Sequence, residues 1–421
     1  MIETDITYLE THLNIALSLY MQRVNCIEQK YVQTSVQHAI EKRLLIHLHI
    51  LAHTINENEK KPDDNADLFV YISRRILSSI KEHQQEVLLF SKEIFIEYPF
   101  PKGLIDAFIL FYNEDINRFL NELYEENREL RATIITIWHF CGQQIPIGLL
   151  NQSELQHQDT ELQSAVLNYH AEQDNISLEL FQNYYRSLVE DVQKENLGSS
   201  VIHASLWGGM LRQDSNVITA IRRAIELESD EIKREKYLRL AALNGSNEFL
   251  PIFNSVSENK PEFGSYLISL LGTTESIKIL FSMLQKPRIS LLIIPAWQLI
   301  TGQELKVVPR ISLVENNSKA KPNVDKADDV PLIADVKSAQ MWAKKYVSKW
   351  KEDSRYIHGE ICNKNNLMEL SYLLSGKIGK DVFDLLSLNF NRTLNLKLNM
   401  WTSDKFKVLD EISKNNHATN S

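Results

Sequence analysis

The segments AALNGSNEFLPIF (241–253) and SLLGTTESIKILF (269–281) decide the fold expected for this chain, because they are two copies of one pattern. Gly272 lies 27 residues after Gly245 (272 − 245 = 27), and each glycine ends an apolar run and precedes a polar step into the next one. The same offset relates Glu248 to Glu275, Leu250 to Ile277, and Ile252 to Ile279. Since a glycine just past a helix end adopts the left-handed conformation without strain, the pattern predicts consecutive helical hairpins.

Earlier segments extend this pattern toward the N-terminus. The stretches TIWHFCG (136–142) and SLWGG (205–209) are further apolar runs that close on glycine. The segment 216–228 has one apolar and one polar face at helical spacing; the apolar face holds Val217, Ile218, Ile221, Ala224 and Ile225. A hairpin with one apolar face cannot bury it alone, and a period of about 20–50 residues is typical of solenoids. We therefore predict an all-α fold built around an α-solenoid.

The composition favours the same fold class. The 421 residues include only 13 glycines and 11 prolines, against average usage of about 7% and 5%. Both residues break helices, glycine through backbone entropy and proline through its missing donor and its ring. With 43% hydrophobic and 24% charged residues, the chain can form a substantial core.

Charge and cysteine usage argue against several classes of protein. The formal net charge is −9, whereas a general nucleic-acid binder needs a concentrated basic surface. The three cysteines are Cys26, Cys141 and Cys362; their wide spacing fits neither a disulfide framework nor a CxxC metal site.

The N-terminus lacks the basic cluster of a signal peptide, and the most apolar stretch, Ile289–Ile300, is too short to span a bilayer. We expect a cytoplasmic protein without membrane insertion.

The same periodicity divides the rest of the chain. We expect an N-terminal helical region at 1–127, HEAT-like helical repeats at 128–313, a polar linker or mobile loop at 314–331, a C-terminal helical unit (a helical cap) at 332–412 and a disordered tail at 413–421. Helices are expected at 4–25, 35–55, 67–83, 84–97, 103–111, 115–125 and 128–141, and then near 335–352, 365–375 and 379–390.

Three histidines in HLHILAH (47–53) are the best metal candidates. His49 and His53 are four residues apart and therefore share one helical face. Zinc needs a third ligand, but Lys42 and Ile46 lie on that face, and His47 falls on the apolar stripe instead. The favoured interpretation is solvated or core-edge histidines, and we predict no metal site.

An aromatic and basic segment admits two interpretations. Trp342, Tyr346 and Trp350 recur every four residues among four lysines, which are Lys344, Lys345, Lys349 and Lys351. Such a pattern could bind nucleic acid or an anionic surface, or it could be an aromatic core stripe flanked by lysines whose stems cover it. The acidic net charge favours the core stripe.

No residue pattern indicates catalysis. Cys141 and His139 could form a nucleophile and base, but residues two apart on a helix do not face each other, and Cys141 closes an apolar run typical of a buried thiol. The common hydrolase, nucleotide-binding, zinc-protease and calcium-loop motifs do not occur in the sequence. We predict a protein that is not an enzyme, with no catalytic residues and no cofactor.

Several segments resemble a bacterial family of HEAT-like repeat proteins whose genes often lie beside type VI secretion modules. They are IEKRLLIHLHILA (40–52), SLLGTTESIKILFSML (269–284), IIPAWQLITGQEL (293–305), YIHGEICNKNNLMELSYLL (356–374) and NLKLNMWTSDKF (395–406). The resemblance implies a HEAT-like helical-repeat fold and a place in secretion, and it carries no catalytic residues over. The sequence has fewer alanines and glycines than that pattern and a longer polar insert at 314–331.

The expected function is therefore protein binding. The resemblance implies a non-catalytic accessory of a type VI secretion system, which holds a secreted effector or spike protein as an adaptor or chaperone, or as an immunity partner. One alternative is a helical-repeat nucleic-acid-binding protein or DNA glycosylase-like enzyme, which the acidic balance disfavours. Another is a general assembly scaffold. The partner, the binding face and the oligomeric state stay open at this point.

Overall fold

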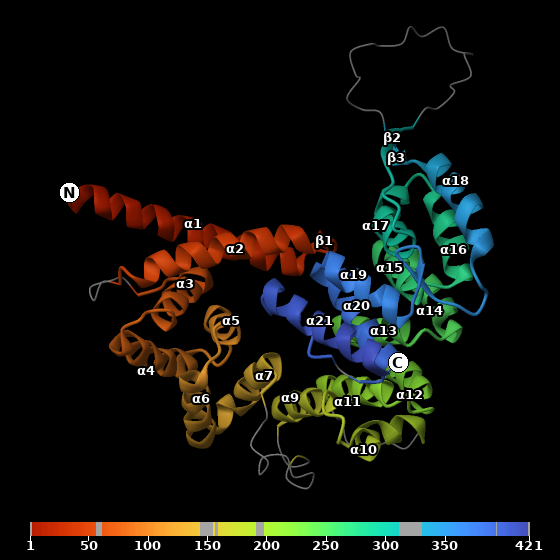
Figure 1. Ribbon diagram of the computed structural model, residues 1–421. Helices are drawn as coiled ribbons and strands as arrows, with labels where there is room; N and C mark the ends of the chain where they lie inside the picture. Colours follow the sequence, from red (N-terminus) through yellow and green to blue (C-terminus); the bar gives the residue numbers. More distant parts are fainter. Residues whose placement is uncertain are drawn as a thin grey trace, which may run out of the picture. The chain divides into compact units, whose positions relative to one another are not determined.

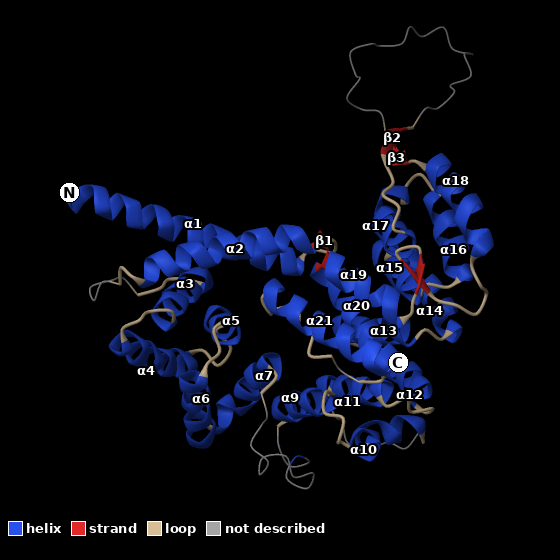
Figure 2. Cartoon of the chain, viewed as in Figure 1, coloured by secondary structure: helices blue, strands red, loops and turns tan. Residues whose placement is uncertain are grey.

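The computed structural model describes residues 2–55, 61–143, 155, 159–190, 198–310, 331–392 and 394–419. Over these ranges nearly all regular structure is α-helical (Figures 1 and 2), which confirms the all-α prediction. The strands described are short antiparallel pairs: β1 (Val32–Gln33) with β6 (Leu374–Ser375), β2 (Val307–Pro309) with β3 (Leu332–Ala334), and β4 (Tyr356–Ile357) with β5 (Glu360–Ile361).

The chain forms two compact units. Unit 1 comprises Met1–Ala220 and Leu367–Ser421, and unit 2 comprises Ile221–Asn366. The boundary at residue 220 falls within helix α12 (Val217–Leu227). The division predicted above is based on sequence repeats and a polar linker, not on compactness, and it stays a prediction. Its linker at 314–331 lies almost wholly outside the described residues.

Unit 1 is a succession of packed helices. In sequence order α1, α3, α5, α7, α9 and α11 each pack against the next of this set. The bounds are α1 Ile2–Glu28, α2 Thr34–Ala52, α3 Asn65–Ile76, α4 Lys81–Glu97, α5 Lys102–Leu110, α6 Glu114–Glu126, α7 Arg131–Cys141, α9 Thr160–Ala171, α10 Leu178–Val189, α11 Ser199–Leu211, α19 Lys364–Leu373, α20 Gly376–Phe390 and α21 Thr402–Thr419. Helices form near the ranges predicted at the N-terminus, except that α3 ends at Ile76 although the sequence predicts helix to residue 83. Helix α21 continues through residues 413–419, where the sequence predicts a disordered tail.

Unit 2 contains the two matching segments. Its helices are α13 (Glu231–Asn244), α14 (Leu250–Asn259), α15 (Pro261–Leu271), α16 (Thr274–Leu284), α17 (Ser290–Thr301) and α18 (Val336–Tyr346). Helix α13 packs on α15, and α15 packs on α17. Gly245 and Gly272 end α13 and α15 with φ values of +86° and +71°. Both glycines are therefore the C-terminal caps that the sequence predicts, although a solenoid as such stays a prediction.

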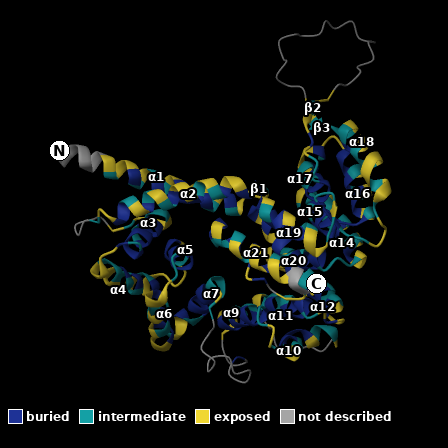
Figure 3. Cartoon of the chain, in the orientation of Figure 1, coloured by how far each residue is buried: buried dark blue, intermediate teal, exposed yellow. Residues whose placement is uncertain are grey.

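Most helices have a buried and a more exposed face (Figure 3), whereas α7 has no exposed residue. Helix α12 follows its predicted pattern, with Val217, Ile221 and Ile225 buried. No helix among the described residues is long and apolar enough to cross a membrane.

One arginine in unit 2 bonds to the carbonyl ends of two repeat helices. Arg355 Nη1 and Nη2 donate to Leu243 O (2.8 Å) and Ala242 O (2.9 Å) at the end of α13. Its Nε and Nη2 donate to Leu271 O (3.1 Å) and Leu270 O (2.9 Å) at the end of α15. The last carbonyls of a helix have no partner within it and carry partial negative charge, so one guanidinium satisfies both ends.

The residues after Arg355 continue this role at a third helix. The backbone N–H of His358 donates to Leu299 O (2.7 Å), and that of Gly359 donates to Ile300 O (2.9 Å), near the end of α17. Residues 355–359 therefore hold the ends of α13, α15 and α17 and are referred to as the cap segment.

A second segment does the same in unit 1. Residues 394–402, referred to as the strap, lie between α20 and α21 and contact helix ends far away in the sequence. The Trp401 indole N–H donates to Leu110 O at the end of α5 (2.8 Å), and Arg23 of α1 donates to Asn399 O (2.6 Å). Around the strap, α20 packs on α1 and α11, and α21 packs on α2 (Figure 1).

The glycines of SLWGG correct one prediction. The sequence pattern places Gly208 and Gly209 at a helix end, but α11 continues to Leu211 and both glycines lie inside it. A Cβ built on Gly208 would lie 2.2 Å from Phe181 Cδ1 of α10, and one built on Gly209 would lie 2.6 Å from the Tyr185 hydroxyl oxygen. These glycines allow two aromatic rings to pack directly on the helix backbone. The sequence alone does not distinguish a glycine with this role from a glycine that ends a helix.

Gly208→Ala is expected to lower the free energy of unfolding of unit 1 by about 1–3 kcal/mol, as is typical for overpacking. The added methyl group must displace the buried Phe181 ring. Urea unfolding followed by tryptophan fluorescence measures the change. Ser200→Ala on the exposed side of the same helix is the matched control; an equal effect of both substitutions would show that the close packing is unimportant.

Candidate functional site

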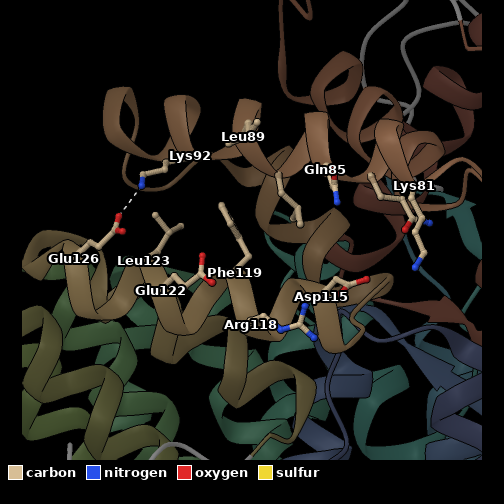
Figure 4. A pocket seen from close by; sticks show the side chains of 12 residues that line it. Lys81, Gln85, Leu89, Lys92, Asp115, Arg118, Phe119, Glu122, Leu123 and Glu126 are labelled. Atoms are coloured by element: carbon tan, nitrogen blue, oxygen red, sulfur yellow. Dashed lines mark hydrogen bonds and ion pairs between the residues drawn. The ribbon is translucent and has the colours of Figure 1, made fainter.

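The candidate site is a groove between α4 and α6 with a volume of about 580 Å³, within the range of about 300–1,000 Å³ typical of binding sites. Figure 4 shows Phe119 and Leu123 rising from α6 toward α4. Both helices contribute lining residues; they are Lys81, Gln84, Gln85, Leu88, Leu89 and Lys92 from α4, and Asp115, Arg118, Phe119, Glu122, Leu123 and Glu126 from α6.

The two walls have the same spacing. On each helix the lining residues stand at i, i+3, i+4, i+7, i+8 and i+11, and each α6 position lies 34 residues after its α4 counterpart, as in 115 − 81 = 34 and 126 − 92 = 34. Positions with this spacing form one stripe along a helix. Each wall of the groove is therefore one stripe of side chains along its helix, and the two stripes have the same spacing.

The middle of the groove is apolar and accessible. Leu89 is 68% exposed, although large aliphatic residues are usually buried. Leu123 is buried, and the Phe119 ring packs edge-on against Phe108 of α5, with centroids 6.0 Å apart. On α4, Ile96 is 62% exposed and lies one turn beyond Lys92. Lys92 lies between the two exposed residues, and the half-buried Leu88 and Phe119 add to the apolar surface around Leu89. An exposed apolar patch of this kind marks an interaction surface.

Charged side chains frame this apolar middle. Lys92 Nζ lies 2.6 Å from Glu126 Oε2 across one end of the groove (Figure 4). At the other end Arg118 Nη1 lies 3.3 Å from Asp115 Oδ1. All four side chains are at least 40% exposed, so these ion pairs are weak, of the order of 0–1 kcal/mol. They can exchange partners when a ligand enters.

The structure separates the three histidines predicted as metal candidates. His47 Nδ1 lies 2.7 Å from His12 Nδ1 of α1, and burial followed by His12 and Arg43 lowers the pKa of His47. His49 and His53 are exposed. Across the described ranges no group of three or more His, Cys, Asp or Glu residues is arranged to hold a metal ion. The His12–His47 contact joins α1 to α2.

The aromatic and basic segment lies in unit 2 and packs largely on itself. Helix α18 ends at Tyr346, so Trp350 lies beyond the predicted helical stripe. The Trp342 ring contacts Trp297 of α17 at 5.9 Å, and the Trp350 ring stacks on Tyr356 at 4.0 Å. Trp342 and Trp350 are half-buried and Tyr346 is exposed, so the three residues do not form the buried core stripe that the spacing favours. The helix ends before Trp350, which the regular spacing does not reveal.

Cys141 and His139 do not face each other. The Cys141 thiol points to Ile109 O of α5, 3.9 Å away, and burial raises the pKa of that thiol to about 12. A reactive thiol has a lowered pKa instead. His139 Nε2 lies 2.9 Å from Lys397 Nζ of the strap, and Lys397 also contacts the Glu172 carboxylate at the end of α9. These contacts join the strap to α7 and α9, and sequence reasoning did not find Lys397 or Glu172.

Lys397 gives unit 1 a testable pH dependence. Burial lowers the pKa of its ammonium to about 7 from an ordinary value of 10.5. Between these pH values the unfolded chain binds more protons than the folded one, so the free energy of unfolding rises with pH, by at most about 1.4 kcal/mol per pH unit. Lys405, whose pKa burial lowers to about 8, adds to this rise.

In wild-type protein the free energy of unfolding is expected to rise between pH 7 and pH 9. We expect the double variant Lys397→Met/Glu172→Gln to lose most of the part of this rise that Lys397 contributes and to keep the part that Lys405 contributes. Urea unfolding at pH 7, 8 and 9 measures it, with Lys92→Met as the control because that side chain is 40% exposed. An unchanged slope in the double variant would contradict the assignment.

Comparison with known proteins returned no matching family model, no matching curated protein and no matching solved structure.

Proposed function

We propose that this chain is a non-catalytic protein-binding accessory protein, and that the α4–α6 groove holds a segment of its partner. The exposed apolar patch carries the proposal: Leu89 is 68% exposed at the centre of a groove of about 580 Å³. Burying one such leucine in an interface contributes about 1.5–3 kcal/mol. The exposed leucine and isoleucine of α4, Leu89 and Ile96, favour a protein ligand over a small polar one.

The surroundings of two groups with shifted pKa values, the Cys141 thiol and the Lys397 ammonium, agree with a binding function. Such groups gather at many active sites, but here they join helices to one another. The Cys141 thiol lies against a backbone carbonyl, and Lys397 is 9% exposed between His139 and Glu172. Their packing supports a role in stability.

The cellular context of the proposal is a type VI secretion system in the bacterial cytoplasm. The resemblance of five segments to a secretion-associated repeat family supports it. In this context the partner is a secreted effector or spike protein, and this chain acts as its adaptor, its chaperone or its immunity partner.

Photocrosslinking in the cells that make the protein tests the function. A photoreactive residue at Leu89 or Gln85 is expected to form one discrete adduct with another protein, identified by mass spectrometry. The same residue at Glu86, which is exposed on α4 but outside the groove lining, is the matched control. Identical adducts at positions 86 and 89, or none at 89, would reject the groove as the binding site. An adduct with a nearby-encoded effector or spike protein supports the secretion context, and an adduct with an unrelated protein rejects that context alone.

A further inference from the structure

The partner that fits the groove can be specified further from the direction of its walls; this step rests on the proposed function. Lys81 and Asp115, near the starts of α4 and α6, line one end, whereas Lys92 and Glu126, near their ends, form an ion pair at the other. The two helices therefore run in the same direction. Their dipoles add, with positive potential at the first end and negative potential at the second.

The charged side chains strengthen this polarity. A helix is stabilised by acidic residues at its start and basic residues at its end, but neither α4 nor α6 has a basic residue in its last turn. Lys81, Asp115 and Arg118 line the positive end of the groove, and Lys92, Glu122 and Glu126 line the negative end, so the two ends carry net charges of +1 and −1. Lys81 and Glu126 oppose the preference of their own helices, although acidic residues in both first turns follow it. A ligand of opposite polarity would relieve that repulsion.

We propose that the groove binds an amphipathic helix of a partner protein that runs antiparallel to α4 and α6. Its positive N-terminal end would lie near Glu122 and Glu126, and its negative C-terminal end near Lys81 and Arg118. The lining spans 11 residues of α4 (92 − 81 = 11), or about 16 Å at 1.5 Å per residue. That length accommodates three turns of a docked helix.

The sequence of this partner helix follows from the lining. Apolar side chains at i, i+4 and i+7, the usual anchors of a helix in a groove, would pack on Leu88, Leu89, Phe119 and Leu123. Basic residues would precede or open the helix, and acidic residues would close it. A second copy of this chain fits less well, because two grooves placed face to face leave a void, and voids forfeit packing energy.

Binding of two synthetic peptides of identical composition tests this inference. Both are 16-residue helices with leucine anchors at i, i+4 and i+7; the first carries Lys-Lys at its N-terminus and Glu-Glu at its C-terminus, and the second carries these pairs exchanged. The second is intrinsically the better helix, because its charges suit its own dipole. Fluorescence anisotropy is nevertheless expected to show at least tenfold tighter binding of the first peptide to the full chain.

Variants of the chain assign the site. Leu89→Glu is expected to weaken binding of the first peptide at least tenfold, whereas Glu86→Lys, outside the lining, leaves it within twofold. The quadruple variant Lys81→Glu/Arg118→Glu/Glu122→Lys/Glu126→Lys is expected to prefer the second peptide. All substituted residues except Leu89 are exposed polar positions, and circular dichroism verifies the fold.

Equal affinity for the two peptides, or no binding of either at millimolar concentration, overturns the antiparallel-helix inference. It leaves the proposed function intact where crosslinks at Leu89 still form. Self-association that Leu89→Glu abolishes, measured by sedimentation, identifies a second copy as the occupant and also overturns it. Absence of both crosslinks and peptide binding rejects the function and the inference together.

Discussion

Arg355→Ala is expected to lower the free energy of unfolding of unit 2 by roughly 3–5 kcal/mol. The substitution removes four hydrogen bonds from a charged donor, each of a kind that contributes about 1.5–3 kcal/mol but is not additive. It also leaves carbonyls at the ends of α13 and α15 without a partner. Arg355→Lys is expected to recover little, because an ammonium cannot reproduce the planar fork of a guanidinium.

Urea unfolding and hydrogen exchange measure this effect together. Faster exchange is expected first at the final turns of α13 and α15, since these are the ends that the guanidinium bonds. Arg288→Ala is the control, because Arg288 is exposed in the same unit and such changes usually cost within about 0.5 kcal/mol. A loss below about 1 kcal/mol for Arg355→Ala would mean that water satisfies the helix ends equally well.

Arg23→Met is expected to destabilise unit 1 by about 3–5 kcal/mol, the usual effect of removing one partner of a buried ion pair. Arg23 Nε lies 3.0 Å from Glu41 Oε1, and their side chains are 1% and 3% exposed. The Glu41 carboxylate also accepts from the Thr402 N–H at 2.7 Å, and Arg23 donates to Asn399 O at 2.6 Å. The pair therefore joins α1 and α2 to the strap.

The double variant Arg23→Met/Glu41→Leu decides what the pair itself contributes. Because a buried pair replaced by apolar residues is often neutral, we expect the double variant to be more stable than Arg23→Met. Equilibrium unfolding of both single variants and the double variant gives the coupling energy. A double variant with the summed loss of both single variants would show that the two side chains act independently.

Much of the helical framework could be predicted from sequence, since amphipathic spacing and glycine caps are local signals. The 27-residue offset identified Gly245 and Gly272 as the ends of α13 and α15, and both adopt positive φ. Gly208 was misread because a packing glycine and a cap glycine look alike in a sequence. Only the Phe181 ring that lies against it separates the two cases.

The groove and the long-range contacts could not be predicted, for two physical reasons. The walls of the groove match in position but rarely in residue type: Leu89 pairs with Leu123, but Lys81 pairs with Asp115. Their 34-residue offset therefore leaves little trace in the sequence. The hydrogen bond from Arg23 to Asn399 spans 376 residues, and helical periodicity carries no information on such contacts.

The strap has a consequence for biosynthesis. The carbonyl of Leu110 accepts its hydrogen bond from the indole of Trp401, which is synthesised 291 residues later. At translation rates of about 5–20 residues per second, roughly 15–60 s separate the appearance of these two groups on the ribosome. During that interval the early helices lack the contacts that the strap makes with them, and their unsatisfied groups are exposed to chaperones and proteases until the strap emerges.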